Sequence, residues 1–132
     1  MAPDARRGTG RRGEDLAAAR LEHLGYAIVE RNFRTREGEL DLIASRARTL
    51  VFCEVKALVA RPGGPSAGPA TPLEAVGPAK RSQVRRIAGA WLAAQREGGE
   101  IRRWRSLRFD AIGVLLSPHG ELLRLDHVEG AF

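Results

Sequence analysis

Two short apolar segments that carry charged residues constrain this chain more than any other feature. Residues 38–43 read Gly-Glu-Leu-Asp-Leu-Ile, and residues 51–56 read Val-Phe-Cys-Glu-Val-Lys. Their aliphatic, aromatic and β-branched residues are typical of buried strands, yet both segments hold groups that are costly to bury without a partner. The chain must therefore fold so that these charges meet one another or a ligand.

The spacing of the two segments predicts how their charges meet. An antiparallel hairpin that turns within residues 46–49 places Asp41 directly opposite Glu54. Directly opposed residues have their Cβ atoms about 5 Å apart, and like charges repel at that separation. A divalent cation would relieve the repulsion, and carboxylate oxygens suit Mg²⁺ or Mn²⁺. We therefore expect a metal site at Asp41 and Glu54.

Lysine is rare in this chain, which makes its two lysines informative. Of 22 Lys and Arg residues, only Lys56 and Lys80 are lysine. Arginine stays protonated in proteins, whereas a lysine amine near a metal in a partly dry pocket can lower its pKa and orient or deprotonate a water. Glu54 and Lys56 project to the same strand face. Lys56 is therefore a candidate catalytic group, and a surface ion pair with the opposed Glu39 is the alternative.

Length and composition indicate one domain, residues 1–132, because domains commonly run to about 100–150 residues. No segment approaches the roughly 20 consecutive apolar residues of a membrane span, so no membrane partner is expected. The single cysteine, Cys53, cannot form an internal disulfide, and together these features indicate a cytoplasmic protein. Whether the chain forms a homodimer is left open.

The formal net charge of +6 indicates a polyanionic partner such as nucleic acid, with charge for solubility alone as the alternative. Twelve of the arginines gather in two stretches. They are Arg6, Arg7, Arg11 and Arg12 in the first, and Arg81, Arg85, Arg86, Arg96, Arg102, Arg103, Arg105 and Arg108 in the second.

The N-terminal part is predicted to form a helix over 10–24, with apolar or small residues at 17, 18, 21 and 24 and a left-handed C-terminal cap at Gly25. Glu14 falls on the same stripe. It is either a partner of the helix N-terminal dipole or a third acid leaning over the metal pair.

The rest of the chain is predicted to form strands, one long loop and a second helix. The strands are 26–33, 39–44 and 50–58 as a meander, then 107–116 and 121–128 around a turn at 117–120. The proline-rich loop 59–72 either closes over a substrate or is a tolerated insertion. Asp110 is expected to pair with a neighbouring arginine rather than bind metal.

The second helix is predicted to begin at Pro78 and to end at Gly98-Gly99, with an apolar stripe at 84, 87, 88, 91 and 92. Lys80 and Gln83 lie one turn before that stripe. They either reach the metal pocket or are ordinary solvated residues of the first turn. We take Arg11, Arg12, Lys80 and Gln83 as candidate nucleic-acid contacts.

An acid on a helix, an Asp on one strand and Glu-x-Lys on the next resembles the PD-(D/E)xK nuclease superfamily, at Glu14, Asp41, Glu54 and Lys56. Longer segments resemble the YraN-type family of small bacterial proteins over nearly the whole chain. They are Gly10-Arg11-Arg12-Gly13-Glu14-Asp15-Leu16-Ala17, Leu24-Gly25-Tyr26, Arg31-Asn32-Phe33-Arg34, residues 38–44, Phe52-Cys53-Glu54-Val55-Lys56, Arg108-Phe109-Asp110 and Ala131-Phe132.

The resemblance implies a restriction-endonuclease-like α/β core, with a mixed central sheet of about five strands flanked by helices. It implies a metal-dependent endonuclease similar to archaeal Holliday-junction resolvases, acting on branched or single-stranded DNA. Asp41, Glu54 and the carbonyl of Val55 would hold Mg²⁺ or Mn²⁺, Glu14 a second metal or its water shell, and Lys56 the attacking water. The alternative is an inactive DNA-binding or recombination-accessory module with the same fold.

Overall fold

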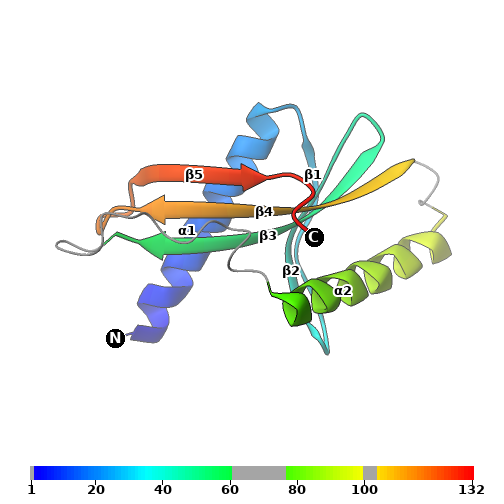
Figure 1. Ribbon diagram of the computed structural model, residues 1–132, viewed down its shortest axis with the longest axis horizontal. Coiled ribbons are helices and arrows are strands. Elements are labelled where there is room, and N and C mark those ends of the chain that lie inside the picture. The colour runs from blue at the N-terminus through cyan, green and yellow to red at the C-terminus, as the bar shows by residue number, and fades with distance from the viewer. Residues whose placement is uncertain (1, 61–76, 100–103) are drawn as a thin grey trace.

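The computed structural model describes residues 2–60, 77–99 and 104–132, and for residues 2–7 it describes the backbone only. Two helices and five strands follow one another along the chain (Figure 1). They are α1 (Ala2–His23), β1 (Ala27–Thr35), β2 (Gly38–Arg46), β3 (Thr49–Val59), α2 (Pro78–Glu97), β4 (Ser106–Leu116) and β5 (Leu122–Val128). Most of the predicted loop 59–72 lies outside the described residues.

The five strands form one mixed sheet in the order β1-β2-β3-β4-β5. The first three make the predicted antiparallel meander, β3 and β4 run parallel, and β4 and β5 form a second antiparallel pair. Parallel neighbours require a crossover connection, and the segment containing α2 supplies it. The α/β class with a mixed five-stranded sheet and flanking helices is confirmed.

The predicted hairpin of β2 and β3 has the expected register. Its two-residue turn is formed by Ala47 and Arg48, which have φ angles of 49° and 67°. Positive φ at both central residues is the geometry that matches the natural twist of a two-residue hairpin. From this turn the paired residues run from Arg46 and Thr49 to Leu42 and Cys53.

The helices pack on opposite faces of the sheet and define two cores. In Figure 1, α1 passes behind the strands and α2 lies beside β2. The core on the α1 side includes Ala17, Ala18, Leu21, Leu42, Val51 and Cys53, and the core on the α2 side includes Leu40, Ile43, Leu50, Phe52, Val84, Ile87 and Trp91. The predicted helix stripes are therefore confirmed, except that Leu24 follows the end of α1 and is exposed.

Helix α1 begins at Ala2, earlier than the predicted Gly10. A Cβ at Gly8 or Gly10 would meet nothing within 4 Å, so nothing in the structure explains this longer helix. From Gly13 onward α1 docks onto the sheet. Gly13 is needed for this docking, because a Cβ at that position would lie 2.5 Å from the Cβ of Ala57 on β3. The helix ends at His23, and the left-handed cap predicted at Gly25 is confirmed by its φ of 94°. Neither described helix has the length and apolar character to span a membrane.

Candidate active site

The regular pairing of β2 with β3 stops just before the charged residues. Beyond the pair of Leu42 and Cys53, the carboxylate of Asp41 accepts a hydrogen bond from the backbone N–H of Val55, with 2.7 Å between Oδ2 and N. The N–H and C=O of one strand residue point to the same edge of the strand. The Val55 carbonyl is therefore directed toward the gap in which the Asp41 carboxylate lies.

The side chains of β2 stop alternating regularly between the two faces of the sheet at Asp41. Leu40 packs in the core under α2, whereas Leu42 packs in the core under α1, although regular alternation would place both on one face. On the neighbouring strand Asn32, which lies across from Asp41, has a φ of 55°. The two strands thus depart together from regular geometry at the residue predicted to bind metal. The prediction assumed simple alternation there.

Three carboxylates meet at this irregularity. Glu14 from α1 and Glu39 and Asp41 from β2 each have an oxygen within 4.8 Å of the others, and all three are half-buried. Because α1 begins several turns before Glu14, and the helix dipole acts mainly within the first turn, the dipole interpretation of Glu14 is wrong. Its carboxylate leans over Asp41 instead.

Glu54 is a fourth acid beside this group, and its two oxygens differ. Oε2 lies 3.3 Å from the ammonium of Lys80 on α2, whereas Oε1 is buried and has no hydrogen-bond partner among the described residues. A buried carboxylate oxygen without a donor is costly, so this oxygen fits a site that takes a cation. Lys80 therefore reaches the pocket, the first of its two predicted alternatives.

The acids oppose one another electrostatically. Burial, and next the charge of Glu54, raise the pKa of Asp41 to about 8, although the N–H of Val55 lowers it. The charges of Glu14 and Glu39 make smaller contributions to the same rise. Burial also raises the pKa of Glu54. A divalent cation would favour the ionised form of these carboxyl groups, and hard cations prefer carboxylate oxygens as ligands. The residues therefore fit Mg²⁺ or Mn²⁺.

Lys56 is exposed and makes no ion pair or hydrogen bond with any residue that the structure describes. The alternative surface ion pair of Lys56 with Glu39 is not formed. Glu39 instead accepts hydrogen bonds from Arg34, at 2.6 Å, and from Asn32, at 2.8 Å. The ammonium of Lys56 is thus not held by a protein group in the described part of the chain.

The remaining predicted contact residues form no ion pair or hydrogen bond with the four carboxylates within the described part of the chain. Arg11 and Arg12 are exposed on α1, and Nε of Arg12 donates to the carbonyl of Gly120 at 3.1 Å. The side-chain amide of Gln83 donates to the carbonyl of Glu37, which joins α2 to the turn between β1 and β2. Lys80 is therefore the one of these four predicted contacts that touches the acidic group among the described residues.

Sequence reasoning missed two members of the site. Glu39 stands two residues before Asp41, a spacing that was a usable signal, but the regular hairpin assigned it to Lys56. Asn32 carries no charge and stands in the sequence only within the segment Arg31-Asn32-Phe33-Arg34. Its left-handed backbone has no strong sequence signal beyond the fact that Asn tolerates this conformation better than most residues.

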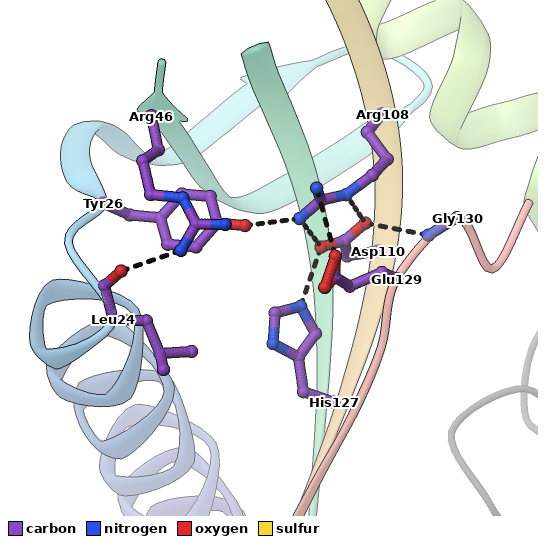
Figure 2. Close-up of polar contacts among 8 residues, drawn as sticks. All are labelled: Leu24, Tyr26, Arg46, Arg108, Asp110, His127, Glu129 and Gly130. Atoms are coloured by element: carbon purple, nitrogen blue, oxygen red, sulfur yellow. Dashed lines mark hydrogen bonds and ion pairs between the residues drawn. The ribbon is translucent and has the colours of Figure 1, made fainter.

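A second polar cluster lies around Asp110, which is fully buried (Figure 2). Arg108 donates two hydrogen bonds to it, each of 2.8 Å, while His127 lies 2.7 Å from it and the N–H of Gly130 donates at 3.0 Å. Arg108 also donates to the hydroxyl of Tyr26 at 2.6 Å. The predicted pairing of Asp110 with a neighbouring arginine is confirmed, and the cluster joins β4 to β5 and the segment after it.

The sequence profile of a family described as uncharacterised protein family UPF0102 matches residues 13–114. The chain belongs to this family. A UPF0102 protein of Nocardia farcinica is 46% identical over 93% of this chain and 87% of its own length. Those of Geobacter sulfurreducens and Frankia alni are 44% and 40% identical, over 93% and 100% of this chain and 87% and 100% of their own lengths.

Membership in UPF0102 confirms the resemblance to the YraN-type proteins. The matched span contains all four acids of the site, which are Glu14, Glu39, Asp41 and Glu54. It also contains both lysines. Arg11 and Arg12 precede it, and the residues that close the Asp110 cluster from β5 follow it.

Proposed function

We propose that this UPF0102 protein is a metal-dependent endonuclease that hydrolyses phosphodiester bonds in DNA. The observation that carries the proposal is the convergence of four carboxylates at the end of the β2–β3 pairing, with Lys80 in contact with one of them, Glu54. Lys56 stands two residues beyond Glu54 on the same strand. Branched or single-stranded DNA is the proposed substrate, on the strength of the resemblance to resolvases.

Asp41, Glu54 and the carbonyl of Val55 would hold Mg²⁺ or Mn²⁺, and Glu14 would bind a second ion or its water shell. A bound ion supplies Lewis acidity and lowers the pKa of a coordinated water, which makes a nucleophile available at neutral pH. The orphaned oxygen of Glu54 and the raised pKa of Asp41 support this assignment, because both groups gain when a cation enters.

The protein's own cations would perform the remaining tasks. Lys56 has no partner among the described residues, so its ammonium is free to orient a water toward the phosphorus. Lys80 enters the site from α2 and would neutralise charge on a phosphate. Arg11 and Arg12 are exposed and would contact the DNA backbone, where arginine supplies affinity that does not depend on base sequence.

One observation favours the alternative, a DNA-binding or recombination-accessory module without turnover. Lys80 already neutralises one oxygen of Glu54, so the acids are partly compensated by the protein itself. In that case DNA binding would persist and cleavage would be absent in every divalent metal.

Cleavage assays separate the two functions. The wild-type protein and Glu54→Gln are incubated with four-way junction, single-stranded and duplex DNA, in Mg²⁺, in Mn²⁺ and in EDTA. The nuclease proposal requires cleavage by the wild type that EDTA abolishes and that Glu54→Gln lacks. Equal cleavage by both proteins would reveal a contaminant, and tight binding with no cleavage would establish the accessory module.

A further inference from the structure

Asn32 connects two of the clustered acids. Its side-chain nitrogen, Nδ2, lies 2.8 Å from Oε1 of Glu14 and 2.8 Å from Oε1 of Glu39. A primary amide has two N–H donors, so one side chain on β1 donates to a carboxylate on α1 and to another on β2. Asn32 therefore joins three elements at the site.

These two hydrogen bonds work against the repulsion between the acids. Hydrogen bonds to ionised carboxylates are shorter and about twice as strong as neutral ones. Glu39 is also held by Arg34 through its other oxygen. Glu14 receives no side-chain hydrogen bond other than that of Asn32 among the described residues. The position of Glu14 next to Asp41 thus depends on this amide.

The backbone of Asn32 supports the same conclusion. Its φ of 55° lies in the left-handed region, which costs most residues roughly 1–2 kcal/mol and Asn less. Such conformations persist where their surroundings require them, often at functional sites. Asn32 lies across from Asp41, between the pairs formed by Arg31 with Leu42 and by Phe33 with Leu40.

We propose that Asn32 is a positioning residue, whose amide holds Glu14 and Glu39 beside Asp41 in the arrangement that a divalent cation requires. This inference rests on the proposed metal-dependent function. Asn32 acts through the carboxylates and does not itself touch metal or DNA. Residues that orient metal ligands commonly change metal affinity by 10–100-fold when they are removed.

Asn32→Gly is the sharpest variant, because glycine adopts a positive φ without strain and lacks the amide. Mn²⁺ binding measured by calorimetry is expected to weaken by about 10–100-fold. The melting temperature should stay close to that of the wild type. In the cleavage assay kcat should fall while KM for DNA stays unchanged, because the amide does not contact the substrate.

Two control variants isolate the amide. Ala47→Gly changes another left-handed residue, at the β2–β3 turn away from the acids. Arg31→Gln removes the neighbouring link between α1 and β1, an ion pair of 2.7 Å with Asp15. Both should bind Mn²⁺ as the wild type does. Asp41→Asn provides the reference for a lost ligand.

The outcomes distinguish this inference from the function on which it rests. If the wild type binds Mn²⁺ and Asn32→Gly binds it equally well, the inference is overturned and the proposed function stands. If the wild type binds no Mn²⁺, both are overturned.

If Asn32→Gly does not fold, a measurement on the wild-type protein still tests the inference. The side-chain amide of Asn32, observed by NMR, is expected to shift on saturation with Mg²⁺ and to broaden with Mn²⁺. An unperturbed amide at saturating metal would overturn the inference.

Discussion

Lys56 is the residue whose substitution separates the possible roles of the site most clearly. We expect Lys56→Arg to reduce kcat for DNA cleavage by at least about 100-fold, because arginine keeps the charge but matches neither the compact ammonium nor its ability to lose a proton. Folding and DNA affinity should hardly change, since the side chain is exposed and makes no ion pair with the described residues. Full cleavage by this variant, with Glu54→Gln inactive, would refute the role.

The buried carboxylate of Asp110 is expected to make the stability of the protein depend on pH. Burial alone would raise its pKa, but the hydrogen bonds from Arg108, His127 and Gly130 outweigh burial and lower the pKa to about 2. A carboxylate with a depressed pKa contributes stability that is complete above its unfolded pKa near 4 and is lost as pH falls toward 2. The contribution is of the order of 2 kcal/mol.

The measurement is urea unfolding between pH 2 and 6. Asp110→Asn should be less stable than the wild type at pH 6, and its stability should change less between pH 4 and 2. Asp126→Asn is the control, because Asp126 is half-exposed and pairs with Arg124 on the same strand. If the two variants behaved alike, the buried cluster would not be the source of the acid sensitivity.

Single residues also show what could be predicted from the sequence. The register of the β2–β3 hairpin followed from its spacing as far as the pair of Leu42 and Cys53, because the turn fixes the pairs beyond it. The change of facing between Leu40 and Leu42 did not follow, because both are apolar and a sequence pattern does not reveal which core each enters. The role of Glu39 was missed because regular alternation along the hairpin paired it with Lys56.

At the scale of elements, alanine substitutions at two glycines of α1 are expected to change the stability of the protein in opposite directions. Gly13→Ala should destabilise the protein, because its Cβ would lie 2.5 Å from the Cβ of Ala57 and force α1 away from β3. Gly10→Ala should stabilise it by up to about 1 kcal/mol, because nothing lies within 4 Å and alanine favours the helix. Thermal unfolding of both variants tests this. A loss of stability in both would mean that helix packing is not the cause.

The start of α1 was predicted too late in the chain. The prediction placed it at Gly10, whereas the helix begins at Ala2, and the glycines at 8 and 10 give no local signal for the earlier start. Helix α2, by contrast, carries its signals locally, with Pro78 at its start and Gly98 at its end, and its bounds were predicted closely. A helix boundary that is marked by such local signals could be predicted, whereas the start of α1 carries none.

For the whole molecule, the net charge of +6 predicts a strong dependence of DNA binding on salt. Each phosphate contact releases condensed counterions, so the dissociation constant should rise steeply between 50 and 200 mM salt, by about tenfold or more for several contacts. Fluorescence anisotropy with labelled single-stranded and junction DNA measures this. A dissociation constant that stayed flat over this range would exclude nucleic acid as the partner.

The acids and lysine of the site come from segments far apart in the chain, with Glu14 on α1, Asp41 on β2, Glu54 on β3 and Lys80 on α2. No fragment of the chain that lacks one of these elements contains the complete group. During synthesis, a ribosome would have to deliver residues up to α2 before the last member arrived. Under the proposed nuclease function, the protein would therefore be unable to cut DNA during its synthesis and would gain that activity only as a finished fold.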